Sequence, residues 1–216
     1  MNADETEILE SEEKSWQGPL KIIGALLLIL LIIIMVVPHY GIKYNPEPKN
    51  IPTYDEIFTE MPSVKNTTEH SVYSKEDFQK FMKPNNPYIK TSADKISTQS
   101  CRDNRICYAK AIFYFIRDEF NYINDPRNIE YVKTAEETII SRGGDCDDLS
   151  VLLANMLESI GIETEFVFVP QHVFIKIKLN EALNKYKDDE GWIYLDPACS
   201  YCSFGEMSLS SFKNIK

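Results

Sequence analysis

Three residue types that can act together in nucleophilic catalysis follow one another in the C-terminal half of the chain. Cys146 lies among two glycines and three aspartates, His172 precedes a run of alternating apolar residues, and Asp196 ends a short apolar run. A histidine beside a thiol makes it a strong nucleophile, and a carboxylate can hold the imidazole in orientation. If the fold brings these side chains together, they can transfer an acyl group through a thioester.

The cysteine stands at the predicted start of a helix. Asp145 fits the N-cap position and Asp148 the third helical position of a capping box. The positive end of the helix dipole favours a thiolate at Cys146, whereas the charges of Asp145 and Asp147 oppose it. We therefore expect a cation, most often a histidine, to activate the thiol. The alternative is that Cys146 is only a small buried residue of the helix N-terminus.

Of the three histidines in the chain, His172 is the candidate partner. His39 ends a long apolar run, and His70 lies in a polar stretch beside the sequon at residues 66–68. Both positions lie far in sequence from the predicted helix that bears Cys146. A single strand histidine is more often structural than catalytic, so the position of a carboxylate decides the case.

Strand parity brings that carboxylate to the histidine. Residues 173–179 and 192–196 alternate as strands, and His172 and Asp196 both lie out of phase with the apolar positions of their own runs. If the two strands pair, both side chains emerge on the same face. A bulge near Pro170 would then turn His172 toward the cysteine-bearing helix.

The segments GGDCDDLSVLLANMLESIGI, QHVFIKIKL and WIYLDP, in this order, resemble the transglutaminase-like superfamily, a papain-like group with a Cys–His–Asp triad. The resemblance covers about residues 135–197. It implies that Cys146 is the nucleophile, that His172 is the general base and acid, and that Asp196 orients the imidazole. It also implies protein or peptide amides as substrates.

The helix start also supplies a donor for the oxyanion that acyl transfer forms. We expect the backbone N–H of Cys146 to be the first donor. The sequence does not assign a second one. We expect no metal ion or cofactor at this site.

The order of predicted elements indicates an α+β domain with an antiparallel sheet, because helices come first and strands follow. It is consistent with a papain-like core in which the cysteine-bearing helix packs on the sheet. A short helix is predicted from Ser74, and residues 83–100 are interpreted as a loop. The remaining helices are predicted over residues 104–122, 135–141 and 146–160, and the strands over 163–169, 173–179 and 192–196.

Four further cysteines, Cys101, Cys107, Cys199 and Cys202, occur in two close groups. An even set with one left over is typical of a disulfide-bearing domain with one working thiol, which we predict to be Cys146. The three pairings that four cysteines permit stay open. Zinc held by the same four sulfurs is an alternative, although their spacing is looser than that of a zinc ribbon.

An uncharged segment over residues 22–42 contains the apolar run IIGALLLILLIIIMVV. At about 1.5 Å per residue, a helix of this length crosses a hydrocarbon core of about 30 Å. A buried core helix and a cleaved signal peptide are the alternatives. The run has no polar face, and acidic residues precede it, so we predict an uncleaved single-pass transmembrane anchor.

The anchor divides the chain into four parts. Residues 1–21 are predicted to be an acidic disordered tail, and residues 43–72 a proline-containing extended spacer. The transglutaminase-like domain is predicted over residues 73–216. The sequon and the cysteine count favour a position of this domain outside the cytoplasm.

These observations leave three hypotheses for the function. The first is a membrane-anchored thiol enzyme, either a cysteine protease or amidase or a transglutaminase-like acyltransferase, acting on protein or peptide amides. The second is a surface module that keeps the fold and binds proteins without turnover, and the third is a zinc-stabilised interaction domain. The net charge of −10 argues against nucleic acid as a partner.

Overall fold

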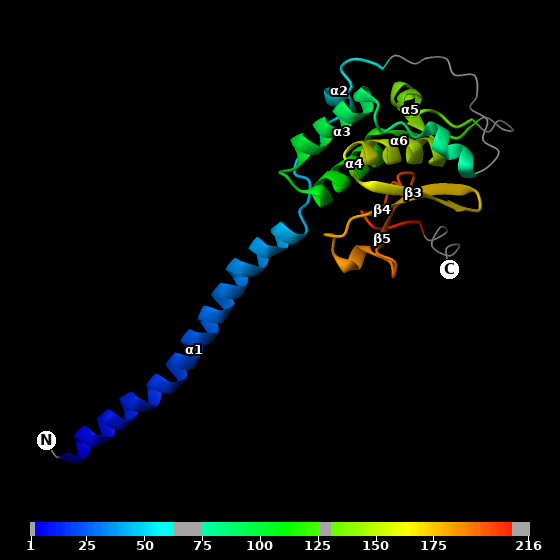
Figure 1. The fold of residues 1–216 in the computed structure, drawn as a ribbon. Helices are drawn as coiled ribbons and strands as arrows, with labels where there is room; N and C mark the ends of the chain where they lie inside the picture. The colour runs from blue at the N-terminus through cyan, green and yellow to red at the C-terminus, as the bar shows by residue number, and fades with distance from the viewer. Residues whose placement is uncertain (1–2, 63–74, 126–130, 209–216) are drawn as a thin grey trace. The chain divides into compact units, whose positions relative to one another are not determined.

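The computed structural model describes residues 3–62, 75–125 and 131–208, with side chains from Gly18 onward apart from those of residues 38, 39, 42, 43, 75 and 76. The chain divides into two compact units, Met1–Tyr44 and Asn45–Lys216 (Figure 1). The sequon at residues 66–68, His70 and the predicted helix start at Ser74 lie outside the described residues.

The first unit is one helix, α1 (Ala3–Tyr44). Its stretch Gly18–Val37 is long and apolar enough to cross a membrane, and its large apolar side chains are exposed. The helix begins at Ala3 and so includes most of residues 1–21, for which the sequence predicts disorder. Glutamate and lysine are good helix formers, and an adjoining helix removes the cost of nucleation, so the acidic segment continues the apolar one.

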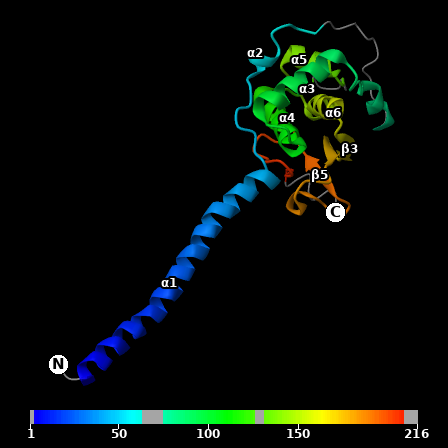
Figure 2. The ribbon, with the colours of Figure 1, turned by 60° about the vertical axis from the view of Figure 1, so that its left-hand side comes forward.

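The second unit is an α+β domain built around one central helix, as predicted. Helix α6 lies between the sheet on one side and helices α3, α4 and α5 on the other, and both views show this arrangement (Figures 1 and 2). The helices are α2 (Tyr54–Ile57), α3 (Pro87–Ser100), α4 (Arg105–Glu119), α5 (Ala135–Ser141) and α6 (Cys146–Ser159). The strands are β1 (Asn121–Tyr122), β2 (Gly143–Gly144), β3 (Glu163–Val169), β4 (His172–Lys178) and β5 (Trp192–Leu195), and the 3₁₀ helices are η1 (Lys75–Phe81) and η2 (Asn184–Tyr186).

The main sheet is antiparallel, in the order β3-β4-β5. The pairing of β3 with β4 runs without interruption from Glu163 opposite Lys178 to Val169 opposite His172. Pro170 and Gln171, the latter at φ 61°, form the two-residue turn between them. A tight turn therefore takes the place of the bulge expected near Pro170, and His172 is the first residue after it.

Helix α3 replaces the loop predicted over residues 83–100. Asn86 caps it by accepting hydrogen bonds from the N–H groups of Tyr88 (2.9 Å) and Ile89 (3.4 Å), with Pro87 at its start. The buried face combines Ile89, Ala93 and Ile96 with three serines. Because serines fill buried positions, the apolar period of this helix is too weak to recognise in the sequence.

The N-terminal part of the second unit packs on the domain, where the sequence predicts an extended spacer over residues 43–72. Tyr54, Ile57 and Phe58 are buried in the main core. The hydroxyl of Tyr54 donates to the carbonyl oxygen of Ile139, and its N–H to the Glu119 carboxylate at 2.8 Å. The compact unit thus starts at Asn45 and not near residue 73, because aromatic side chains between the prolines supply apolar area to bury.

A buried lysine fastens the start of this segment. The side chain of Lys110 in α4 is 1% exposed, and its ammonium donates to Asn45 Oδ1 at 3.0 Å and pairs with the Glu47 carboxylate. The ammonium also faces the rings of Tyr186 and Phe204 at 5.3 and 5.8 Å from their centroids. A charge this deeply buried depends on its partners.

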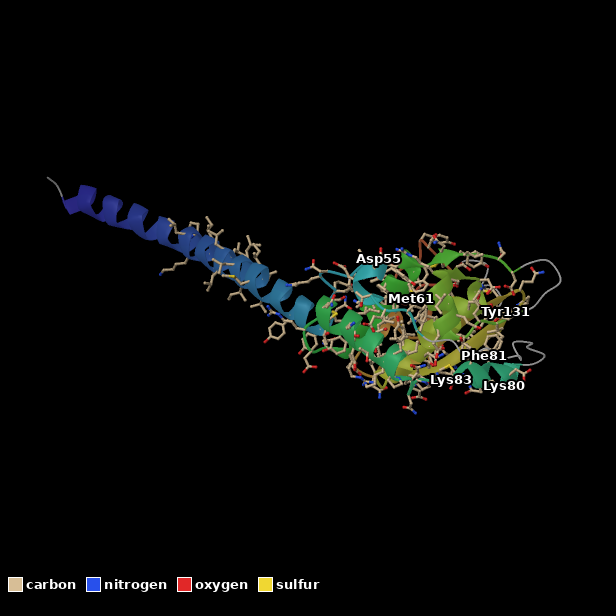
Figure 3. The ribbon with its side chains drawn as sticks, turned by 90° about the horizontal axis from the view of Figure 1, so that it is seen from above. Asp55, Met61, Lys80, Phe81, Lys83 and Tyr131 are labelled. Carbon is tan, nitrogen blue, oxygen red and sulfur yellow. A yellow bond between two sulfur atoms is a disulfide. The ribbon has the colours of Figure 1, made fainter. Side chains whose placement is uncertain are left out.

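A second apolar cluster lies under η1. Phe78 and Phe81 pack there with Val132 and Val151, while Lys80 on the same turn extends at the surface (Figure 3). This cluster covers the side of α6 that the main core leaves open.

The cysteines form two local disulfides, Cys101–Cys107 and Cys199–Cys202, and Cys146 is free. The predicted division into four bonded cysteines and one free thiol is confirmed. Each bond joins the close neighbours, which decides the pairing that the sequence left open. The four sulfurs are therefore not available as zinc ligands.

Removing the carboxylate that pairs with Lys110 should destabilise the domain more than removing the lysine. Glu47→Ala leaves a buried ammonium without its anion, which costs about 2–4 kcal/mol. Lys110→Met keeps an apolar chain against the two rings and leaves Glu47, which is 57% exposed, to water. We expect this change to cost about 1 kcal/mol or less. Urea unfolding of the full chain in detergent measures both, and equal losses would contradict a role for the buried charge.

Candidate active site

The start of α6 holds Cys146 at the first helical position. Asp145 is the N-cap, and its side chain accepts a hydrogen bond from the Asp148 N–H at 3.5 Å. The Asp148 carboxylate in turn accepts one from the Asp145 N–H at 3.3 Å. This is the capping box that the sequence predicts, and it leaves the Cys146 thiol partly exposed.

Two closely packed glycines, Gly143 and Gly144, precede this helix start. Strand β2 pairs in parallel with β1, so that Asn121 lies opposite Gly143 and Tyr122 opposite Gly144. A Cβ on Gly143 would lie 2.5 Å from the Asn121 carbonyl oxygen, and one on Gly144 would overlap the Asp148 side chain. Only glycine therefore fits at either position.

Asp148 anchors the same region from inside. Its side chain is fully buried, and it accepts a hydrogen bond from the Lys133 N–H at 2.7 Å and another from the Lys133 ammonium. Burial raises the pKa of Asp148 to about 6, although the Lys133 ammonium and N–H act in the opposite direction. The ion pair with Lys133 compensates its charge at neutral pH.

Burial opposes the charged form of the Asp147 carboxyl. Burial raises the pKa of its carboxyl to about 9, and a hydrogen bond with Asp145 and the nearby charges add to the effect. The sequence suggests three negative charges beside Cys146. Burial disfavours the charge of one and Lys133 pairs with another, so these carboxylates oppose a negative charge on the sulfur less than the sequence indicates.

Among the described residues, Asp145, Asp147 and Asp148 are a group of acidic side chains close enough to share a cation, with oxygens within 4.8 Å of one another. The side chains of Asp145 and Asp147 already accept a backbone N–H, and the Asp148 carboxylate pairs with the Lys133 ammonium. We therefore interpret the cluster as the cap and support of α6.

His172 and Asp196 lie on one face of the sheet, as strand parity predicts. The imidazole Nε2 is 3.0 Å from Asp196 Oδ2, and the two side chains are 21% and 1% exposed. The other oxygen, Oδ1, is buried and has no hydrogen-bond partner in the part of the chain that the structure describes. The carboxylate therefore acts mainly on the imidazole.

Cys146 lies near enough to the same imidazole to raise its pKa. Burial lowers the pKa of His172, but the hydrogen bonds and charges of Asp196 and Cys146 raise it to about 10. Since Nε2 faces Asp196, Nδ1 is the nitrogen left for the thiol. The structure thus brings the three sequence-predicted residues together. The side chain of His39 is not among the described ones.

Tyr122 lies beside this group, and the sequence analysis did not identify it. Its side chain is 50% exposed. Burial raises the pKa of its phenol to about 12, with added contributions from the charges of Cys146 and Asp145, so the hydroxyl remains a donor. A strand of two residues has no periodicity, and only its pairing with the glycines before Cys146 reveals the position of Tyr122.

A hollow of about 380 Å³ opens beside His172 and Asp196. The turn between β3 and β4 forms one wall, and the loop closed by the Cys199–Cys202 disulfide forms the other. Its further lining residues are Pro170, Gln171, Ala198, Ser200, Tyr201 and Ser208. The arrangement of thiol, imidazole, carboxylate and adjoining hollow is suited to nucleophilic attack on a carbonyl group.

Comparisons with known proteins extend these observations. The family model of the transglutaminase-like superfamily matches residues 90–197, which is half of the chain. No curated protein matches the chain.

Two solved structures are similar to part of the chain. One is a candidate cysteine protease from Cytophaga hutchinsonii, 18% identical, with a TM-score of 0.39 over 60% of this chain and 46% of that one. The chain thus spans less than half the length of that protein. The other is LapG from Legionella pneumophila, 14% identical, with a TM-score of 0.40 over 72% of this chain and 78% of that one.

The family match covers the cysteine-bearing helix, the histidine-bearing strand and the aspartate that follows β5 in a single stretch of the chain. From this match we conclude that the chain belongs to the transglutaminase-like superfamily.

Proposed function

We propose that this protein is a membrane-anchored thiol enzyme that hydrolyses protein or peptide amides through a Cys146–His172–Asp196 triad. The observation that carries the proposal is the position of His172, whose imidazole lies 3.0 Å from the Asp196 carboxylate and near enough to Cys146 for that residue to raise its pKa. Each of the three side chains has the environment that its role requires.

In the first half of the reaction, the Cys146 thiolate attacks the amide carbon and forms a tetrahedral oxyanion. The imidazolium of His172 gives its proton to the nitrogen, the C–N bond breaks, and the amine leaves with the acyl group held as a thioester. In the second half, His172 takes a proton from water, the resulting hydroxide attacks the thioester, and the C–S bond breaks. The acid leaves, and the thiolate of Cys146 and the imidazolium of His172 are restored.

Two donors are proposed for the oxyanion. The backbone N–H of Cys146 is free of the helical ladder because it belongs to the first turn of α6. The Tyr122 hydroxyl is the second, since strand pairing places Tyr122 opposite Gly144, two residues before Cys146, and its phenol keeps its proton. The carboxylate of Asp196 orients the imidazole and stabilises its charged form.

The location of the domain is also part of the proposal. The exposed apolar stretch Gly18–Val37 has no partner surface within the described residues that would bury it, which supports an anchor in a bilayer. The two disulfides support a domain outside the cytoplasm, because such bonds persist in oxidising compartments.

Iodoacetamide should alkylate Cys146 of the full chain rapidly near neutral pH, and His172→Ala should slow the reaction about tenfold or more because the thiolate loses its cation. The other four cysteines are in disulfides, so the measured alkylation rate belongs to Cys146 alone. Cys146→Ser serves as the blank. Equal rates in wild type and His172→Ala would reject the triad and favour a binding module without turnover.

The Tyr122→Phe variant distinguishes the contribution of the nucleophile to the rate from that of the oxyanion donors. Alkylation forms no oxyanion, so its rate should not change. Acylation of Cys146 by p-nitrophenyl acetate does form one, and it should slow about a hundredfold, as the loss of one such donor does elsewhere. Unchanged acylation would remove Tyr122 from the mechanism and leave the triad in place.

The titration of His172 can be followed by NMR of labelled histidine, because the chain has only three histidines. With its pKa raised from 6.5 to about 10, the ring should keep its proton through neutral pH and lose it as the pH rises through about 10. Its contribution to stability is accordingly complete below 6.5 and is lost toward pH 10. Asp196→Asn should move the titration to lower pH, and Cys146→Ala should do so by less. A wild-type ring that titrates near 6.5 would contradict this environment.

The anchor should keep the protein in the membrane fraction through an alkaline carbonate wash, and deletion of residues 18–37 should release it. N-terminal sequencing of the mature protein is the control. A soluble product that begins beyond Val37 would identify the segment as a cleaved signal sequence.

A further inference from the structure

The hollow beside His172 lies on one particular side of the triad. Its lining includes His172 and Asp196 but not Cys146. The turn at Pro170 and Gln171 and the loop Cys199–Cys202 enclose it. The hollow therefore adjoins the imidazole and not the sulfur.

The proposed reaction determines what occupies such a position. The amine leaves only after the imidazole has given it a proton, so the leaving nitrogen must lie within hydrogen-bond reach of the ring. The acyl carbon must at the same time touch the sulfur. The part of the substrate that follows the nitrogen consequently extends on the imidazole side, where the hollow lies.

The charge of the hollow determines which substrate residues it can accept on the amine side. No lysine or arginine is among its lining residues within the described chain, and Asp196 is its only carboxylate. Once the thioester has formed, the sulfur carries no charge and His172 must be neutral to accept a proton. The negative charge of Asp196 is then uncompensated, which disfavours an acidic group in the hollow.

The wall of the hollow is held firmly in place. The disulfide Cys199–Cys202 closes the loop, and the guanidinium of Arg117 in α4 donates to the Cys202 carbonyl oxygen at 2.6 Å. The Tyr114 hydroxyl accepts a hydrogen bond from the Phe204 N–H at 3.2 Å just beyond it. A loop fastened at these points can present the same side chains to every substrate.

Two side chains of this loop line the hollow. Ser200 is exposed and lines the hollow, and Tyr201, which is 75% exposed, stands at its rim. Neither residue belongs to the triad, so both can change without loss of the nucleophile. Ser203, three residues beyond Ser200, is exposed too but does not line the hollow.

We propose that the disulfide-closed loop Cys199–Cys202 and the turn at Pro170 and Gln171 form the subsite for the amine side of the substrate, and that this subsite selects uncharged residues over acidic ones. The proposal rests on the thioester mechanism put forward above. It assigns the binding of the amine side to Ser200 and Tyr201, side chains that take no part in bond making, and the selectivity against acidic residues to the charge of Asp196.

The subsite can be tested in the reverse direction without knowledge of the natural substrate. p-Nitrophenyl acetate acylates Cys146 of the full chain in detergent, and an added amine then competes with water for the thioester. In aminolysis the C–N bond forms, the C–S bond breaks, and His172 carries the proton from the amine to the sulfur. The amines are glutaminamide and glutamic acid α-amide, which are nearly the same size and differ in one charge.

Wild-type protein should transfer its acetyl group to glutaminamide about tenfold faster than to glutamic acid α-amide, the range of a partly screened contact between like charges. Ser200→Arg should bring this ratio close to one, because it places a cation in the hollow. Ser203→Arg adds the same charge directly after the loop and outside the hollow, and it should retain the wild-type ratio. Tyr201→Ala should raise the half-saturating concentration of both amines by a similar factor.

The outcomes separate the two proposals. If p-nitrophenol release does not depend on Cys146, the proposed function fails, and the subsite fails with it. If acylation depends on Cys146 but Ser200→Arg and Ser203→Arg give the same ratio, the subsite is wrong and the enzyme proposal stands. An undiminished acylation burst in each variant shows that the site has folded.

Discussion

The buried carboxylate of Asp148 is the interaction on which the site depends. It caps the first turn of α6, accepts the N–H and ammonium of Lys133, and fills the space that a side chain on Gly144 would need. One side chain thus joins the helix start, the strand before it and the segment before α5. Because Cys146 is two residues away, the position of its sulfur follows from these contacts.

The electrostatics around the thiol follow from the same burial. Three adjacent aspartates would oppose a thiolate if all were charged, yet burial raises the pKa of the Asp147 carboxyl and Lys133 compensates Asp148. On the other side of the sulfur, Asp196 raises the pKa of His172. Asp196 and Cys146 thus favour the imidazolium form of His172, which is the form that gives a proton to the leaving nitrogen in the proposed reaction.

Helix α4 links the start of the domain to the loop beside the site. Lys110 holds Asn45 and Glu47, and Arg117, two turns further along, holds the Cys202 carbonyl oxygen. The Cys199–Cys202 disulfide then restrains the loop that follows Asp196. The segment after α1 and the wall of the hollow are therefore supported by the same helix, and neither is a free appendage.

The sequence alone was sufficient for the features that local rules govern. The helix start at Cys146, the three strands of the main sheet and the shared face of His172 and Asp196 follow from capping residues and from periods of 3.6 and 2, which are properties of consecutive residues. The division into four bonded cysteines and one free thiol followed from their spacing. Helix α3 was not predicted from the sequence, because buried serines weaken its apolar period.

Only the tertiary structure decided the features that depend on contacts between distant segments. The packing of Tyr54 on the core, the burial of Lys110 against Glu47 and the approach of Tyr122 to Cys146 join residues far apart in the chain. The protonation of Asp147 likewise depends on how much water the whole fold excludes. Local patterns carry no information on such distances or on burial, so the chain order identified the residues of the site, and packing determined their charge and their neighbours.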